Sequence, residues 1–285
     1  MERSDFIKRL TLYVTAPLLL SVNHRNTMRL ANEVRLLRHA TLVIQIGGKK
    51  ILIDPMLSGK GAMDPVGNCG NDIRIPMVNL PLPESEIEEL LEAVDAVIVT
   101  HLHRDHWDAV AQKQIDKGKT IICQPNDESK LNEQGFYATL SVDDRVEWHD
   151  LTISRTNGRH GTGEIGQLMG EVSGFVLDDG QQKIYVAGDT IWCEEVKAAL
   201  QKYQPDYTVL NAGGAQFLKG DPITMTPDDI IKVHDELPET NIIAVHMDTV
   251  NHCFVKRTDL QQALAKSGIV NKVLIPSDGE RMKLK

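Results

Sequence analysis

A dense group of metal-ligand side chains stands directly behind a short β-branched run, and it constrains this chain more than any other feature. Val97-Ile98-Val99 is typical of a buried strand, and His101, His103, Asp105 and His106 follow at once. Alternate side chains of an extended backbone share a face, so His101 and His103 can reach one cation. If the backbone then turns, Asp105 and His106 can reach a second. A polar loop with chance histidines is the alternative, but the spacing favours two adjacent metal sites.

The motif Thr-His-x-His-x-Asp-His after a hydrophobic strand resembles the signature of the metallo-β-lactamase fold superfamily. The resemblance covers the chain from about Arg35 to Arg281. It implies an α/β (α+β) protein, a four-layer αββα sandwich of two similar βα halves with the metals at one edge. It also implies three further ligands downstream: a histidine, an aspartate in a Gly-Asp-Thr or Gly-Asp-Ser turn, and a final histidine.

Candidates for these three positions occur in the expected order. His160 lies in a glycine-rich segment, where the backbone can approach a metal closely, although a flexible glycine loop is the alternative. Asp189 follows a predicted strand in Gly-Asp-Thr and matches the superfamily's bridging aspartate; it could instead cap a helix. His246 ends a predicted strand and matches the last ligand, with His252 as a rival or a pocket residue.

The resemblance therefore implies two metal sites. His101, His103 and His160 hold the first cation, Asp105, His106 and His246 hold the second, and Asp189 bridges the two. His39 stands in Arg-His-Ala-Thr, where related enzymes carry Gly-His-Ala or Gly-His-Ser. We interpret His39 as a satisfied histidine at a strand end, in preference to a role beside the metals or the substrate.

Composition limits the function classes. A net charge of −9 argues against a protein whose main task is to neutralise nucleic-acid phosphates. The four cysteines are widely spaced without a C-x-x-C pair, which indicates neither a zinc knuckle nor a disulfide framework. We therefore expect a cytoplasmic protein.

Residues 1–27 differ from the rest and are interpreted as an N-terminal extension to a hydrolase domain at 28–285. Basic residues precede a mostly apolar run at 10–22, which is the layout of a signal peptide or short anchor. The run is diluted by polar residues and is short for a membrane span, so export or anchoring is the alternative and no stable membrane association is expected.

The remaining pattern alternates strands and helices. Strands are predicted at 34–37, 40–46, 51–53, 96–99, 120–123, 145–148, 151–155, 171–177, 183–187, 207–210, 242–245 and 272–275. Helices are predicted at 83–93, 107–115, 127–134, 194–203 and 258–266, with a further helix from Thr226. Residues 56–83 are rich in glycine and proline, and we interpret them as a flap that shapes the substrate pocket.

The chemistry implied is hydrolysis of a small-molecule ester or lactone, by water that two divalent metal ions activate. Zinc is the expected metal, with manganese or iron as alternatives, and Asp105 is a candidate proton relay. The segment order is most similar to the branch of ascorbate-phosphate lactonase-like proteins.

Alternatives remain open. A phosphodiesterase would use the same metals, and a homo-oligomer is compatible with the sequence. A redox di-iron protein is disfavoured because that branch usually has a carboxylate where His103 stands. A non-catalytic metal-binding protein is disfavoured because each implied ligand is present.

Overall fold

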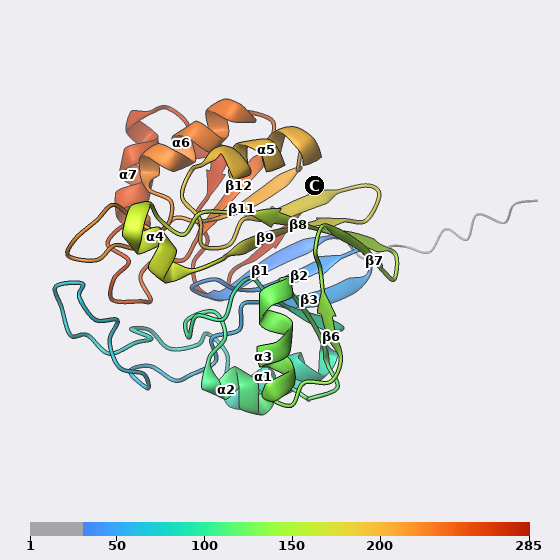
Figure 1. Ribbon diagram of the computed structural model, residues 1–285. Coiled ribbons are helices and arrows are strands. Elements are labelled where there is room, and N and C mark those ends of the chain that lie inside the picture. The colour runs from blue at the N-terminus through green and yellow to red at the C-terminus, as the bar shows by residue number, and fades with distance from the viewer. Residues whose placement is uncertain (1–30) are drawn as a thin grey trace, which may run out of the picture.

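Two seven-stranded sheets lie face to face between two layers of helices (Figure 1). The computed structural model describes residues 31–285, so the predictions for residues 1–27 lie outside the described part. The strand order of the first sheet is β14-β1-β2-β3-β4-β5-β6, and that of the second is β13-β12-β11-β10-β9-β8-β7. The four-layer αββα fold predicted from the sequence is confirmed.

The strand bounds are as follows. The first sheet contains β1 (Glu33–Arg38), β2 (Thr41–Ile46), β3 (Lys49–Ile53), β4 (Ala96–Val99), β5 (Thr120–Cys123), β6 (Thr139–Ser141) and β14 (Arg281–Lys283). The second contains β7 (Arg145–Trp148), β8 (Leu151–Asn157), β9 (Ser173–Asp178), β10 (Lys183–Val186), β11 (Tyr207–Asn211), β12 (Asn241–Val245) and β13 (Val273–Leu274).

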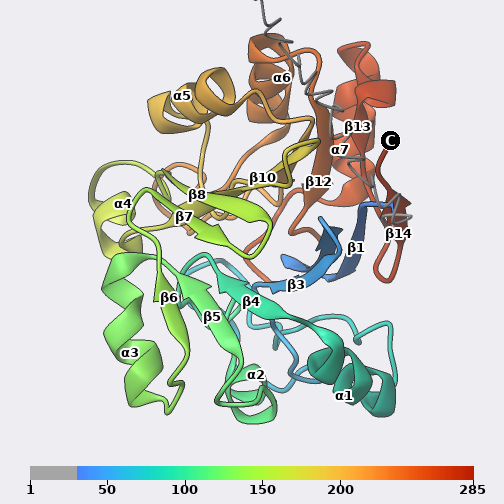
Figure 2. The same ribbon diagram turned by 90° about the vertical axis from the view of Figure 1, so that its right-hand side faces the viewer.

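Three helices cover the outer face of each sheet, as the view in Figure 2 shows. On the first sheet these are α1 (Glu84–Ala93), α2 (Ala109–Gln114) and α3 (Glu128–Glu133), with the 3-10 turn η1 (Pro125–Asp127) before α3. On the second sheet they are α5 (Glu194–Tyr203), α6 (Pro227–Glu236) and α7 (Arg257–Lys266), and the 3-10 turn η2 (Val270–Lys272) follows α7. The short helix α4 (Gly163–Met169) belongs to neither layer.

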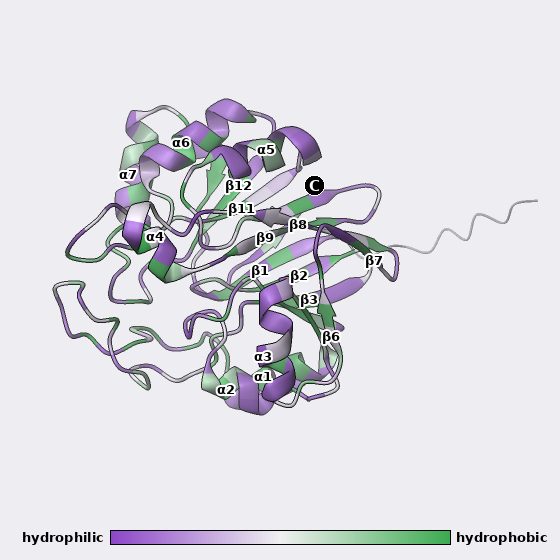
Figure 3. Ribbon diagram, viewed as in Figure 1, coloured by the Kyte–Doolittle hydropathy of each residue, from purple (hydrophilic) through white to green (hydrophobic). Residues whose placement is uncertain are grey.

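The alternation of side chains along the strands builds three apolar layers. Between the sheets, β-branched and aromatic residues such as Ile44, Ile98 and Phe175 are fully buried. Each helix contributes one apolar stripe to an outer layer, for example Val196 and Leu200 of α5. Purple predominates on the outer helices in Figure 3 because their other faces are polar. This burial holds both sheets as rigid supports for the loops at their edge.

Strand directions explain why the ligand candidates meet. In the first sheet β1 and β3 are both antiparallel to β2, and β4 is parallel to β3, so β1, β3 and β4 end at one edge. In the second sheet β10, β11 and β12 are parallel, and β8 runs the same way because both β8 and β10 are antiparallel to β9. Polar residues that follow these strands therefore share one edge of the sandwich.

Several elements differ from the sequence prediction, and the strands β6 and β14 were not predicted. The helix expected at 107–115 is the shorter α2, because the Asp108 side chain accepts a hydrogen bond from the Ala111 N–H and starts the helix there. Helix α4, which follows His160, was not predicted. Among the described residues, no helix is long and apolar enough to span a bilayer.

Candidate metal centre

Asp54 organises the turn that carries the histidine motif. It follows β3, and its carboxylate accepts hydrogen bonds from the Thr100 N–H at 2.8 Å and the Thr100 hydroxyl at 2.7 Å. The same carboxylate lies 2.8 Å from Nδ1 of His106. The backbone then turns, with the N–H groups of His106 and Trp107 both donating to the carbonyl of His103. This turn swings Asp105 and His106 away from the preceding histidines, as the sequence spacing predicts.

One group of three imidazoles, which we name the open subsite, consists of His101, His103 and His160. Nε2 of His101 lies 3.0 Å from Nδ1 of His103. The ring of His160 lies 5.5 Å from that of His101 and 5.2 Å from that of His103, centroid to centroid. The three candidate ligand atoms fall within 4.8 Å of one another. His103 is partly exposed, so this subsite is accessible to solvent.

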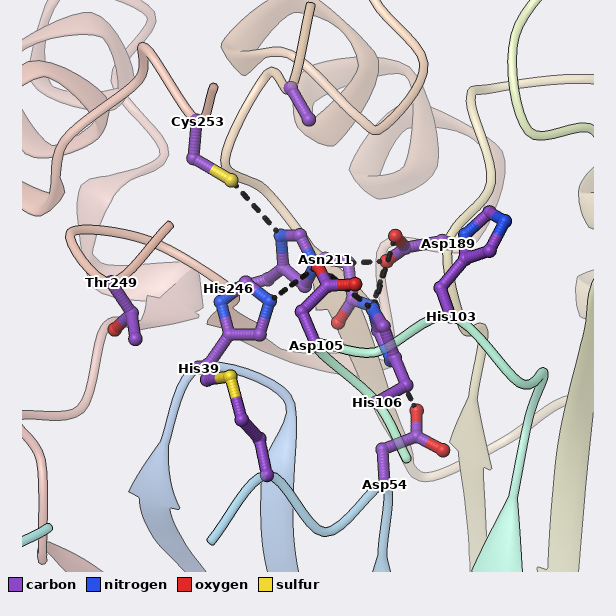
Figure 4. A network of polar contacts seen from close by, with 12 residues as sticks. His39, Asp54, His103, Asp105, His106, Asp189, Asn211, His246, Thr249 and Cys253 are labelled. Carbon is purple, nitrogen blue, oxygen red and sulfur yellow. Dashed lines mark hydrogen bonds and ion pairs between the residues drawn. The ribbon is translucent and has the colours of Figure 1, made fainter. Parts of the chain in front are cut away.

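A second group, which we name the buried subsite, consists of Asp105, His106 and His246. Nε2 of His106 lies 3.2 Å from Nε2 of His246. Oδ2 of Asp105 lies 3.8 Å from the first of these nitrogens and 3.9 Å from the second. Both imidazoles have no exposed surface. Figure 4 shows them on either side of Asp105.

Asp189 lies between the two subsites. Its Oδ2 is 3.5 Å from Nε2 of His160 in the open subsite and 3.2 Å from Nε2 of His106 in the buried subsite. Its Oδ1 is 3.2 Å from Nε2 of His246. The side-chain amide of Asn211, at the end of β11, donates a hydrogen bond to Oδ1 at 2.6 Å and fixes the carboxylate. The structure thus brings all seven residues predicted as ligands together at one edge.

Partners behind the rings set the orientation of each imidazole. Nδ1 of His160 donates to the carbonyl of Ile223 at 2.8 Å. Nδ1 of His246 lies 3.5 Å from Sγ of Cys253, and Nδ1 of His101 lies 3.0 Å from Oγ1 of Thr100. Such contacts select the tautomer in which Nε2 has a free lone pair, which is the form that a metal requires.

The pKa values reflect a compact cluster of opposite charges. Burial lowers the pKa of His106, but the carboxylates of Asp189 and Asp105 outweigh burial, and Asp54 adds to them. The pKa of His106 is therefore raised well above its ordinary value. For Asp189 burial raises the pKa, but His106 and His246 outweigh burial and hold the pKa well below the usual range. The opposite charges of His106 and Asp189 therefore stabilise each other.

His39 differs from the prediction of a satisfied histidine at a strand end. It has no exposed surface, and its ring lies 3.6 Å from that of His246, centroid to centroid. Its Nε2 lies 3.3 Å from Oδ2 of Asp105, whereas Nδ1 has no hydrogen-bond partner. Burial, and next His246, lower the pKa of His39 to about 3, so its ring is neutral.

Backbone conformation marks this edge as specialised. His39, Asp54 and His246 have φ angles of 60°, 44° and 68°, a region that non-glycine residues rarely adopt. The N–H of His246 donates to the carbonyl of His39 at 2.9 Å and ties the two sheets together. Unfavourable φ values of this kind persist where the surrounding structure fixes them, and they cluster at functional sites. The sequence signal that could have identified Asp54 is the Asp-Pro pair directly after a strand.

A cavity of about 230 Å³ opens onto the cluster. His103, His160 and Asp189 line it, and Asp105 is also exposed to it. Apolar side chains and the flap form the remaining wall, which is lined by Val66, Gly67, Met169, Phe217 and Ile223. His252, the rival predicted for the last ligand, lines this cavity and is absent from the candidate metal-ligand groups of the described residues.

The donor set fits a pair of divalent cations. Imidazole nitrogens and carboxylate oxygens are the usual ligands of zinc and similar metals, and both subsites supply them within 4.8 Å of one another. The bridging position of Asp189 and the hydrogen bonds behind the rings complete the arrangement expected of a metal centre.

Comparison with known proteins gives the same family. Residues 49–247 match the beta-lactamase superfamily domain. The protein YddR of Bacillus subtilis is 36% identical over 248 residues, which cover 86% of this chain and 96% of that protein. A metal-dependent hydrolase of Metallosphaera sedula is 27% identical and covers 76% of this chain and 85% of its own length.

Solved structures agree. An isothiocyanate hydrolase from Delia radicum gut bacteria has 40% identity and a TM-score of 0.84, and the match covers 88% of this chain and 99% of that one. A structure described as "a possible metal-dependent hydrolase" from Veillonella parvula has 34% identity and a TM-score of 0.86, with 90% and 100% coverage. The closer similarity to ascorbate-phosphate lactonase-like proteins stays a prediction. The chain belongs to the metallo-β-lactamase fold superfamily and is one of its metal-dependent hydrolases.

Proposed function

We propose that this metal-dependent hydrolase adds water to a small, uncharged electrophile at a centre of two divalent cations, for which zinc is the metal that the ligands favour. The observation that carries the proposal is the cavity of about 230 Å³ that ends on His103, Asp105, His160 and Asp189. His101, His103 and His160 would hold one cation, Asp105, His106 and His246 the other, and Asp189 would bridge. When bound, the cations lower the pKa of a water and stabilise developing negative charge.

The lining of the cavity favours an uncharged substrate. Among the described residues that line it, Arg104 is the one permanent cation, and its guanidinium donates to the carbonyl of Pro65 at 3.0 Å. Sites that transfer phosphoryl groups often add Arg or Lys side chains to the metal ions around the phosphate. A neutral carbon electrophile therefore fits better than the phosphodiester that the sequence left open.

The substrate class we favour is an isothiocyanate, because the isothiocyanate hydrolase from Delia radicum gut bacteria is 40% identical to this chain. Water adds its oxygen to the central carbon of R–N=C=S, and the C–N bond then breaks. Both protons of the water end on nitrogen, so the products are the amine R–NH₂ and carbonyl sulfide. A small ester or lactone, predicted from the sequence, is the second candidate, since the same cavity accepts a carbonyl carbon.

Two side chains of the cavity wall would act on the substrate. Asp105 is ionised, because His106 and His39 hold its pKa well below the ordinary value against the opposing effect of burial, and it can move a proton from water to the leaving nitrogen. His252 has an Nδ1 without a partner, and burial lowers its pKa to about 4. A neutral His252 can hydrogen-bond the substrate.

A substrate panel tests the proposal. Metal-loaded protein is incubated with an alkyl isothiocyanate, a γ-lactone, a nitrophenyl ester and bis-nitrophenyl phosphate, and amine, acid or phenol is quantified. We expect turnover of the isothiocyanate that disappears after chelation and returns with metal. Turnover of the phosphodiester alone, or turnover that survives chelation, would contradict the proposal.

A further inference from the structure

An apolar groove of about 520 Å³ lies beside the metal centre. One wall is α4, which presents Ile165, Leu168 and Met169, and the other is the loop that carries Phe217 and Leu218. None of the residues of α4 is buried, and Leu168 and Leu218 are 76% and 71% exposed. Large apolar side chains on both rims of one groove are unusual on a protein surface without a ligand.

The groove is continuous with the cavity at the metal centre. Met169 and Phe217 line both spaces. His252, which lines the cavity, packs its ring 5.9 Å from that of Phe217, centroid to centroid. A molecule that reaches the metal centre can therefore extend past Met169 and Phe217 between α4 and the 217–219 loop.

Hydrogen bonds hold the walls in place. The N–H of Leu218 donates to the carbonyl of Asn68 in the flap at 2.7 Å. The hydroxyl of Thr162, just before α4, donates to the carboxylate of Asp221 at 3.1 Å. Gly220 allows close packing here, since a Cβ at that position would lie 3.0 Å from Cγ1 of Ile165. These contacts fix the two walls of the groove to the rest of the protein.

We infer that this groove binds an apolar substituent of the substrate while the reactive carbon lies at the metal centre. The inference deepens the proposed function and rests on it. The substrate class is then a small neutral electrophile with an alkyl or aryl arm, such as an aliphatic or aromatic isothiocyanate. Apart from Asn68 and Lys219 the lining is apolar, so an apolar arm fits the groove.

Alkyl hydroxamates of increasing chain length provide the test, because the hydroxamate group binds to the metals and the alkyl chain would bind in the groove. Affinity is measured by calorimetry on metal-loaded protein, from acetohydroxamate upward. Each added methylene is expected to raise the affinity about fourfold, the value for burying one such group, until the groove is full. Leu168→Ser and Leu218→Ser should flatten this dependence and leave acetohydroxamate binding unchanged.

Leu274→Ser is the matched control, because Leu274 on β13 is also exposed, at 44%, and lies outside this groove. It should keep the chain-length dependence of the unsubstituted protein. If acetohydroxamate binds and longer chains bring no gain in affinity, the groove does not bind the substrate arm, and the proposed function is unaffected. Failure of every hydroxamate, acetohydroxamate included, would overturn the proposed function and the groove with it.

A second copy of the chain is the competing occupant of this face. Light scattering on the same variants separates the two. If Leu168→Ser dissociates an oligomer and the chain-length dependence persists, the face is an interface between copies and the inference is wrong. An unchanged oligomeric state with a flattened dependence supports it.

Discussion

The open and buried subsites have similar ligands but different surroundings. In the open subsite His103 is partly exposed, and with His160 it lines the cavity that we assign to the substrate. In the buried subsite His106 and His246 have no exposed surface and do not line that cavity, whereas the third member, Asp105, does. Asp54 supports the ring of His106 from behind.

This difference in exposure predicts different roles for the two subsites. A cation surrounded by protein ligands is held firmly, whereas a site with an open position admits water and substrate. We therefore expect the buried subsite to retain its cation more tightly and the open subsite to contact the substrate. His39 adds a further nitrogen beside the buried subsite, since its Nε2, with Asp105, His106 and His246, belongs to one group of candidate ligands.

The largest effect is expected for Asp189→Ala, which removes the group shared by both subsites. Because this carboxylate faces histidines of both, its loss should lower kcat/KM by at least about a thousandfold. Metal analysis should find less than two ions per chain. Asp235→Ala, an exposed change in α6, is the control and should leave both values unchanged. Near-normal metal content and turnover in Asp189→Ala would refute the shared role.

The second prediction compares His103→Ala with His246→Ala. Each removes one imidazole, and we expect each to lower kcat/KM by about a hundredfold or more. The variants should differ in metal retention after dialysis against a chelator: His103→Ala keeps about one ion per chain, and His246→Ala loses more. Equal retention in the two variants would show that the subsites do not differ in the way their burial indicates.

Sequence reasoning identified the seven candidate ligands from the resemblance to the superfamily's motif. Each of them follows a strand, and parallel strands bring their carboxyl ends to one edge. It could not identify the role of His39. That role depends on the pairing of β1 with β2 and on the approach of the second sheet, which brings His246 to within 3.6 Å of its ring. Contacts between residues about two hundred positions apart leave no local pattern.

The helix α4 escaped prediction for a different reason. It is short, and it contains Gly163 and Gly166, which disfavour a helix. The helical spacing of Ile165, Leu168 and Met169 extends over too few residues to predict one. The flap at 56–83, in contrast, was expected near the site, and Val66 and Gly67 do line the cavity. Its role in shaping the substrate pocket remains a prediction.

An intermediate effect is expected for Asp54→Asn. The change keeps the shape of the side chain but removes the charge that faces Nδ1 of His106 at 2.8 Å. Partners of this kind behind a ligand contribute about 10- to 100-fold to metal affinity or activity. We expect the larger loss at the buried subsite, measured as the affinity for the more tightly bound ion, because Asp54 faces His106 directly and reaches His101 only through the Thr100 hydroxyl. If the affinity for the less tightly bound ion falls and the affinity for the more tightly bound ion stays the same, the assignment of Asp54 to the buried subsite is wrong.

The smallest effect is a count of protons. Without metal, the pKa of His106 lies well above 6.5, so its ring is protonated at pH 7, whereas burial keeps the pKa values of His101 and His160 below 6.5 and their rings neutral. The carboxylates of Asp105 and Asp189 are already ionised.

Because a ligand imidazole must be neutral, loading the centre at pH 7 should displace about one proton from these groups, and that proton should come from the buried subsite. Calorimetry in buffers of different ionisation enthalpy measures the number. The release should decrease as the pH rises through the pKa of His106, because above that value the ring has already lost its proton. If the proton is released only when the less tightly bound ion binds, it comes from the open subsite, and the expected difference between the two subsites is wrong.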